Sequence, residues 1–286
     1  MASLAERLGY AADQPLIIIN CDDIGSSHSA NVACEASMRS GIASSATLMV
    51  PCPWAREAVE RFKDLDVGIH LTLTAEYPTY RWRTLTDAPS LRDAQGYMPR
   101  TAAELWQRAD PVEVEAECRA QIDQALAWGV DITHLDNHMG TLQVSEKLYP
   151  IYVKLGKEYK LPLRMVGTFA DSRLGFHCRA QADKAGIVYP DDFSFQWGRK
   201  MMRGVFEDYL AHPGAGVMEM ILHCVGDTPE LQAYDKTESA IRIHDAEVGV
   251  DPALKDKFER AGVQRISFRG LRDLMRQTHE SNACIR

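Results

Sequence analysis

Short apolar runs alternate with helix-period segments along most of the chain. The first run, Leu16–Asn20 (LIIIN), is rich in β-branched residues, as expected for a strand buried on both faces. Comparable runs predict further strands at Ser44–Val50, Asp66–Leu73, Val130–Asn137, Leu163–Val166, Met218–Val225 and Gln264–Phe268. Helices are predicted between them at Asn31–Arg39, Pro53–Phe62, Pro111–Trp128, Ser145–Lys157, Gly204–Leu210 and Arg269–Thr278.

One of these helices has clear end signals. Asp110 is placed to cap its N-terminus, Pro111 takes the first helical position, and Glu113 has the spacing of a capping box. Gly129 then ends the helix after Trp128. Regular alternation of strand and helix implies parallel strands covered by helices.

The number of strand–helix units predicts one α/β domain, a closed or nearly closed (β/α) barrel formed by residues 1–286, with a core at about residues 15–278. Two segments do not follow the alternation. Ala75–Thr101 is rich in proline and tyrosine and predicts a loop excursion at the rim of the pocket, and Gly186–Trp197 has no clear period.

Composition excludes several classes of protein. The 286 residues are 45% hydrophobic and 25% charged, with a net charge of -8, which disfavours nucleic-acid binding through phosphate contacts. No run of 18 apolar residues predicts a membrane span, and the N-terminus lacks the pattern of a secretory signal. The seven cysteines include no CxxC pair, so we expect a reduced, cytoplasmic chain, with a homo-oligomer left open.

Polar side chains occur at four predicted strand ends. They are Asp22-Asp23, His70, the group His134-x-Asp136-x-His138, and His223. Because parallel strands of a barrel end on one rim, residues that are distant in sequence meet there. We therefore expect a catalytic site on this rim.

The adjacent carboxylates Asp22 and Asp23 have two interpretations. If both were buried they would repel each other, and a divalent cation would relieve this by binding one while the other serves as a general base. Alternatively, an Asp before a turn and a helix is a common N-cap, and Gly25 fits an ordinary turn.

The histidines also have structural alternatives. His70 lies in an apolar strand, where a lone histidine is more often a core residue than a ligand. His134 and His138 share a strand face, but only the later one reaches the strand end, so we expect His134 to be buried below the site. Two histidines and one carboxylate would suit a hydrolytic metal or a non-haem iron.

His223 could act as the acid of an acid–base pair, or could be a core histidine. Its neighbour Cys224 has no evident partner that would lower its pKa, which argues against a thiol nucleophile. Aromatic residues in loops could stack on sugar rings or anchor the loops. The candidate substrate contacts are His28, Trp82, Asp136, Arg164, Phe195 and Trp197.

Five segments together resemble the YdjC-like carbohydrate deacetylase family, in family order over about residues 15–270. They are IIINCDDIGSSHSAN, GIASSATLMV, VGIHLTLT, ITHLDNH and MEMILHCVG. The resemblance implies a single distorted (β/α) TIM-type barrel and one divalent metal ion, Mg²⁺ or Zn²⁺. It also implies hydrolysis of the acetamide of a small acetylated amino sugar.

Carried over by position, the resemblance implies metal binding by Asp23, His70 and His138, with Asp22 as general base and His223 as general acid. The sequence departs from the family pattern in two places. Met139-Gly140 follows His138 where the family often has further histidines, and Cys224-Val225 follows His223 where it usually has Pro-Gly.

The expected reaction is metal-assisted amide hydrolysis, in which the ion polarises the carbonyl and activates water. Asp22 accepts the water's proton, and His223 protonates the leaving amine. One alternative is a metal-dependent sugar isomerase or epimerase, which would usually need a second base that we cannot place. The other is a non-catalytic sugar-binding relative, which the presence of both Asp22 and His223 disfavours.

Overall fold

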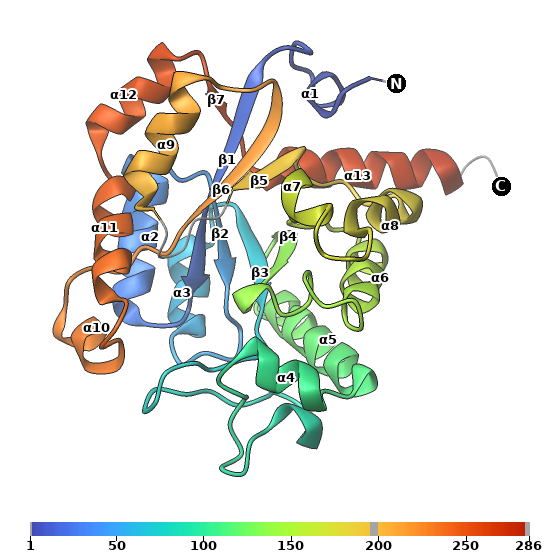
Figure 1. Ribbon diagram of the computed structural model, residues 1–286, viewed down its shortest axis with the longest axis vertical. Coiled ribbons are helices and arrows are strands. Elements are labelled where there is room, and N and C mark those ends of the chain that lie inside the picture. Colours follow the sequence, from blue (N-terminus) through green and yellow to red (C-terminus); the bar gives the residue numbers. More distant parts are fainter. Residues whose placement is uncertain (1, 195–199, 284–286) are drawn as a thin grey trace.

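The computed structural model describes residues 2–194 and 200–283, and its centre is a sheet of parallel strands (Figure 1). The strands in these ranges are β1 (Pro15–Ile24), β2 (Ser45–Leu48), β3 (Val67–Leu71), β4 (Ile132–Asn137), β5 (Asp192–Ser194), β6 (Gly216–Leu222) and β7 (Gln264–Arg265). Their order is β4-β3-β2-β1-β6-β5, with β7 beside the first half of β1. The predicted α/β architecture is confirmed, and the sheet curls into a half-barrel.

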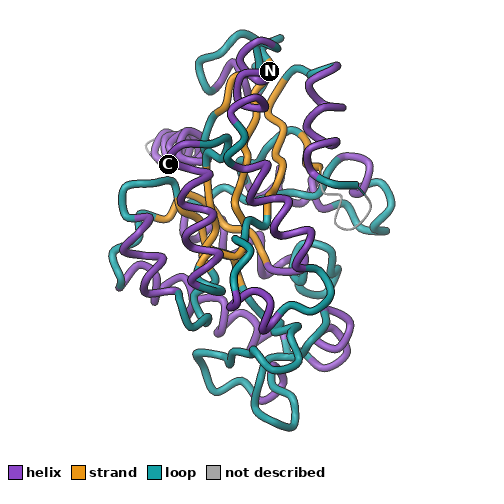
Figure 2. The backbone as a smooth tube through the Cα atoms, turned by 90° about the vertical axis from the view of Figure 1, so that its left-hand side faces the viewer, coloured by secondary structure: helices purple, strands orange, loops and turns teal. Residues whose placement is uncertain are grey.

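Helices cover the outside of this sheet (Figure 2). The α-helices are α1 (Leu4–Arg7), α2 (His28–Ser40), α3 (Ala55–Phe62), α4 (Ala102–Arg108), α5 (Pro111–Ala127), α6 (Tyr149–Tyr159), α7 (Thr168–Asp171), α8 (Cys178–Ala185), α9 (Met202–Ala211), α10 (Pro229–Tyr234), α11 (Ser239–Gly249), α12 (Pro252–Arg260) and α13 (Phe268–Ala283). Two short 3₁₀ helices are η1 (Pro89–Leu91) and η2 (His138–Gly140).

The apolar pattern of β1 follows from its central position. Leu16, Ile17, Ile18 and Ile19 are all fully buried, although successive residues of a strand point to opposite faces of the sheet. Both faces of β1 are therefore packed, and β6 lies along the edge of the strand. The sequence of a strand with both faces covered is a continuous apolar run and does not alternate between apolar and polar residues.

The strand after α6 differs from the prediction. Residues 163–166 form only an isolated parallel bridge, between Leu163 and Leu135. β6 ends at Leu222, so His223 and Cys224 stand in the following loop, whereas the predicted strand continued to Val225. β1 runs four residues further than predicted and includes the Asp22-Asp23 pair.

The capping box predicted for α5 does not form. Asp110 accepts a hydrogen bond from the backbone N–H of Val112 at 2.8 Å, as an N-cap should. The carboxylate of Glu113 instead accepts the backbone N–H of Ser90 at 2.8 Å. Glu113 therefore ties the long excursion to the helix.

The Ala75–Thr101 excursion has a small core of its own. Trp82 and Met98 pack there with Met49, Cys52 and Ala75, all of them buried. In Figure 1 the excursion and α4 lie together at the lower end of the molecule. In the described ranges, no helix combines the length and apolar character needed to cross a bilayer.

Candidate functional site

The carboxyl ends of β1, β3 and β4 bring the predicted site residues together. His70 on β3 is in register with Asp136 on β4, and His138 begins η2 directly after β4. The register between β1 and β2 shifts between Cys21 and Ile24, as at a β-bulge. The strand ends therefore converge on one rim, as parallel topology requires.

A local backbone feature turns both carboxylates of β1 toward the same side. Successive side chains of a regular strand point to opposite faces. Asp23, however, has φ 67°, in the left-handed region that Asp tolerates better than most residues. Asp22 and Asp23 both line one cavity as a result.

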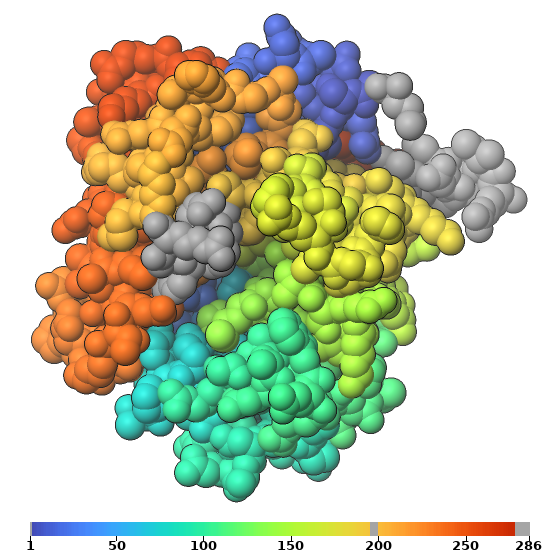
Figure 3. Space-filling view, viewed as in Figure 1, coloured from blue at the N-terminus to red at the C-terminus, as the bar shows by residue number. Residues whose placement is uncertain are grey.

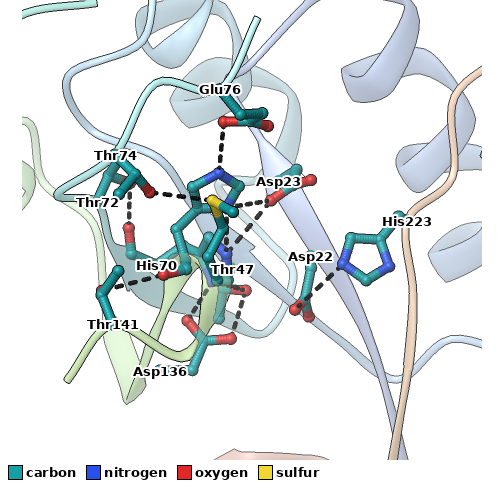
Figure 4. Close-up of polar contacts among 12 residues, drawn as sticks. Asp22, Asp23, Thr47, His70, Thr72, Thr74, Glu76, Asp136, Thr141 and His223 are labelled. Atoms are coloured by element: carbon teal, nitrogen blue, oxygen red, sulfur yellow. Dashed lines mark hydrogen bonds and ion pairs between the residues drawn. The ribbon is translucent and has the colours of Figure 1, made fainter. Parts of the chain in front are cut away.

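Asp23, His70 and His138, here called the ligand triad, form a compact triangle of possible metal ligands. Figure 4 shows Asp23 beside His70. Asp23 Oδ1 lies 3.3 Å from His70 Nε2 and 3.2 Å from His138 Nδ1, and the two ring nitrogens are 3.3 Å apart. Nitrogen or oxygen ligands about 2.0–2.1 Å from one zinc ion, at tetrahedral angles, lie about 3.3–3.4 Å from each other. The triangle therefore has the size of a metal site.

The buried oxygen of this triangle is also suited to a cation. Among the described residues Asp23 Oδ1 makes no hydrogen bond beyond its ion-pair contacts with the rings of His70 and His138, although the residue is only 3% exposed. Buried carboxylate oxygens are normally paired with donors or with metal ions. The ligand triad therefore fits a divalent cation.

Two further carboxylates, Asp136 and Glu76, orient the histidines, and we call them the orienting carboxylates. Asp136 Oδ1 lies 2.6 Å from His70 Nδ1, and Glu76 Oε2 lies 3.0 Å from His138 Nε2. Each contact occupies one ring nitrogen and leaves the other for an ion, as in many metal sites.

The pKa values of both histidines reflect this excess of negative charge. Burial opposes the charged ring, but Asp136 and Asp23 outweigh it and raise the pKa of His70 to about 10. Glu76 and Asp23 likewise outweigh burial and raise the pKa of His138 to about 9. Without an ion the site holds protons; with one, those protons would be displaced.

Asp22 is held by a buried arginine rather than by the histidines. Arg164 contacts both carboxylate oxygens of Asp22 at 2.7 Å, and Asn20 donates to Oδ1 at 2.8 Å. Burial alone would raise the pKa of Asp22, but the charge and hydrogen bonds of Arg164 lower it to about 2. Asp22 is therefore ionised at neutral pH.

Arg164 is shared among three carboxylates, so its single charge does not neutralise them all. It also contacts Asp136 and Glu219, each at 2.7 Å. Burial, with repulsion from Asp136 and Asp22, outweighs the attraction of Arg164 and raises the pKa of Glu219 to about 7. Within residues 2–194 and 200–283, Glu219 Oε2 makes no hydrogen bond, so this oxygen can carry a proton.

His223 stands across from Asp22 at the end of β6, and these two residues are here called the acid–base pair (Figure 4). Its Nε2 is 3.9 Å from Asp22 Oδ2, and its Nδ1 is 4.0 Å from Asp245 Oδ2. Burial outweighs the nearby carboxylates and lowers the pKa of His223 to about 4. The ring is therefore neutral at rest, whereas the sequence suggested a protonated acid.

All five residues line a cavity of about 850 Å³. Figure 3 shows blue and teal atoms at depth near the centre of this face, framed by green and orange segments. The walls include Phe169 and Phe193, and the amides of Asn137 and Gln143. A volume within about 300–1,000 Å³ is usual for small-molecule sites.

The other predicted substrate contacts have varied positions. Arg164 lines the cavity, whereas Asp136 does not and instead contacts His70. His28 lies outside the lining and contacts Glu57 at 3.0 Å. Phe195 and Trp197 lie outside the described residues.

Trp82 also lies outside the cavity lining, and its side chain is 3% exposed. Its indole N–H donates to the backbone oxygen of Thr74 at 2.7 Å, and its ring meets His138 edge-on. The predicted stacking on a sugar does not fit this position, because the ring faces are already packed. Trp82 therefore packs against the ring of His138 and does not face the cavity.

His134 is buried below the site, as the strand period predicted. Its ring stacks on Phe268 with centroids 3.6 Å apart. A Cβ at Gly68 would stand 2.4 Å from His134 Nδ1, so this close approach requires glycine at position 68.

Sequence reasoning missed several residues that shape the site. Glu76 belongs to the Ala75–Thr101 excursion, whose sequence has no helix or strand period. Glu219 lies within β6, where the surrounding apolar residues predicted only a buried strand. Arg242 contacts Asp23 Oδ2 at 2.9 Å, and it belongs with Asp245 to α11, which was not predicted. The spacing of these residues gave no signal, because each meets the site only through the fold.

Comparisons with known proteins agree with this geometry. A family model described as YdjC-like protein matches residues 16–260. The carbohydrate deacetylase of Thermus thermophilus is 40% identical over 159 residues, which cover 55% of this chain and 56% of that protein. The match thus spans little more than half of the Thermus protein. The carbohydrate deacetylase of Geobacillus stearothermophilus is 29% identical over 257 residues, 88% of this chain and 96% of that protein.

A solved structure from Enterococcus faecalis V583 shares the fold. It is described as a proposed cellobiose-phosphate cleavage protein, and it superposes with a TM-score of 0.78 at 22% identity. The match covers 90% of this chain and 99% of that chain. At this identity the likeness supports the fold alone.

Proposed function

The chain belongs to the YdjC-like protein family, and we propose that it is a metal-dependent hydrolase that removes the N-acetyl group from an amino sugar or short chitooligosaccharide. The observation that carries this proposal is the meeting of the ligand triad and the acid–base pair on the floor of one cavity. The family match over residues 16–260 further supports treating the chain as one deacetylase domain.

Asp23, His70 and His138 would hold one divalent cation, Mg²⁺ or Zn²⁺. When bound, such an ion supplies Lewis-acid chemistry, which polarises a carbonyl and lowers the pKa of water. The orienting carboxylates each contact one nitrogen of a histidine ring, so the other nitrogen would be available to the ion. Arg242 contacts the second oxygen of Asp23, so Oδ1 is the oxygen left for the ion.

Asp22 would be the general base. Its low pKa keeps an acceptor oxygen available throughout the neutral pH range, and the bidentate contact with Arg164 fixes where that oxygen stands. The same low pKa means that a proton accepted at Asp22 is readily passed on. Proton transfer by a positioned carboxylate typically contributes about 10²–10⁴-fold to a rate.

His223 would deliver a proton to the leaving amine, which is too poor a leaving group to depart as an anion. Because the ring is neutral at rest, it must gain that proton during turnover. Asp22 Oδ2, 3.9 Å from His223 Nε2, is the group on the cavity floor from which the proton can come. This path lets the base and the acid act in sequence without a large movement of either.

The cavity suits a neutral sugar with an apolar ring face. Phe169 and Phe193 can offer aromatic surface to the C–H groups of a sugar ring, while Asn137 and Gln143 can donate to or accept from hydroxyl and acetamido groups. The Glu76 end of the Ala75–Thr101 excursion reaches the same cavity, which supports a role for this segment in substrate choice.

A screen for acetate release tests the proposal. The purified chain is incubated with acetylated amino sugars and short chitooligosaccharides, with EDTA and after re-addition of Mg²⁺ or Zn²⁺. We expect acetate and a free amine with at least one substrate, loss of both in EDTA, and recovery with one ion. Sugar interconversion without acetate would instead indicate an isomerase or epimerase, and binding without turnover a sugar-binding protein.

A further inference from the structure

Three cysteines meet directly behind the acid–base pair, and the proposed reaction uses none of them. Cys21 lies on β1, Cys34 on α2, and Cys224 in the loop after β6. All three are fully buried, and their sulfur atoms lie within 4.8 Å of one another. We call them the thiol cluster.

Hydrogen bonds to backbone oxygens hold two of these thiols in place. The Cys34 thiol donates to the backbone oxygen of Cys224 at 3.5 Å, and the Cys224 thiol donates to the backbone oxygen of Asp245 at 3.3 Å. Cys21 and Cys224 are 4.0 Å apart at sulfur. Three different elements therefore hold the cluster, so its geometry does not depend on one flexible loop.

We propose that the thiol cluster binds a soft monovalent metal ion of the Cu(I) class, at a site separate from the ligand triad. Three sulfur ligands about 2.3 Å from one ion, the usual zinc–thiolate distance, and in a plane with it, lie about 4.0 Å apart. The Cys21–Cys224 separation of 4.0 Å matches that spacing.

The ligand set selects the kind of ion. Thiolates favour soft ions such as Cu(I), whereas structural Zn²⁺ almost always takes four ligands. Among the described residues, the cluster includes no fourth Cys, His, Asp or Glu ligand atom within the same group. Each thiol that binds as a thiolate releases one proton to solvent, and neither sulfur nor metal changes oxidation state.

The cluster is one residue away from the cavity. Asp22 follows Cys21 and His223 precedes Cys224, and both of these neighbours line the cavity floor. The ligand triad, built from two imidazoles and a carboxylate, would remain the site for a harder divalent ion.

The test is an anaerobic titration of the full chain with Cu(I) presented as its bicinchoninate complex. We expect the protein to withdraw one equivalent of Cu(I), with a thiolate-to-copper absorption band in the ultraviolet. X-ray absorption should then show about three sulfur neighbours at about 2.3 Å. No withdrawal of Cu(I) by the wild-type chain would overturn the proposal.

Variants locate the binding. Cys34→Ala should lose the withdrawn equivalent, and Cys34→Ser, which keeps the side-chain size, should lose it as well. Cys118→Ala is the matched control, since Cys118 is equally buried but lies outside the cluster, and it should bind like the wild type. Asp23→Asn should also bind Cu(I) normally. Retention of the equivalent in both Cys34 variants would place the copper elsewhere and refute the site.

Discussion

The two halves of the cavity floor are held in different ways. In the ligand half, Asp136 fixes the ring of His70 through a contact of 2.6 Å. In the acid–base half, Arg164 fixes Asp22, but His223 Nε2 stands 3.9 Å from Asp22 Oδ2, beyond hydrogen-bonding distance. A metal ion needs ligands that are already in place, whereas proton donors and acceptors often approach only when substrate is bound.

The two halves of the cavity floor also differ in their balance of charge. In the ligand half, carboxylates raise the pKa of His70 to about 10, so negative charge is in excess and a cation is favoured. In the acid–base half, Arg164 compensates Asp22, and burial keeps His223 neutral. The difference predicts that mutations in the two halves have separable effects on ion binding and on turnover.

Removing a ligand should have the largest effect. Asp23→Asn removes the one anionic member of the ligand triad, so we expect loss of the bound divalent ion and acetate release at background level. Metal analysis of the purified variant, together with the acetate assay, checks this. A full equivalent of ion at wild-type affinity would remove Asp23 from the ligand set.

Asp22→Asn should separate the effect on turnover from the effect on ion binding. The amide keeps the size of the side chain but cannot accept the proton, so turnover should fall about 10²–10⁴-fold while ion binding persists. The same two assays apply. If this variant loses the ion instead, the roles of Asp22 and Asp23 are exchanged.

His223→Ala should slow amide substrates by about 10²-fold or more, because proton delivery to nitrogen is removed. An ester analogue of the substrate should be affected far less, since an alkoxide leaves with less help. The comparison uses kcat on the two substrates with the same enzyme preparation. Equal losses on both would show that His223 only positions other groups.

Glu76→Gln should weaken ion affinity by about 10–100-fold, the usual effect of losing a group that orients a ligand. Excess ion should restore most of the activity, which a loss of folding would not allow. Glu146→Gln, at an exposed glutamate outside the cavity, is the matched control. Unchanged ion affinity in Glu76→Gln would mean that His138 is oriented by its packing alone.

The smallest effect concerns pH and stability. The pKa of Glu219 rises from 4.5 to about 7 in the folded chain, so between these values the folded protein holds a proton that the unfolded chain has lost. The contribution of this group to the free energy of unfolding therefore falls as the pH rises through that window. The free energy of unfolding, measured with a denaturant, is compared between the wild type and Glu219→Gln. The wild-type value minus the variant value should decrease from about pH 5 to about pH 7.5. A constant difference would mean that Glu219 is ionised throughout.

The sequence determined the parts of this protein that depend on local pattern. The apolar run of β1 and the end signals of α5 follow from neighbouring residues, so strands and helices were placed within a few positions. The strand ends brought the polar residues to one rim, and the family resemblance then singled out the ligand triad among them. Where pattern was weak, as at residues 163–166 or in α11, the prediction did not match the structure or was not made.

Only the tertiary structure decided what surrounds those residues. The left-handed backbone of Asp23, the contact between Glu76 and His138, and the thiol cluster all join elements that are far apart in the chain. Such contacts leave no period or spacing in the sequence, because they depend on loop paths and on the bulge in β1. Burial and the balance of charges, which set the pKa values of the site, arise only once these elements are packed together.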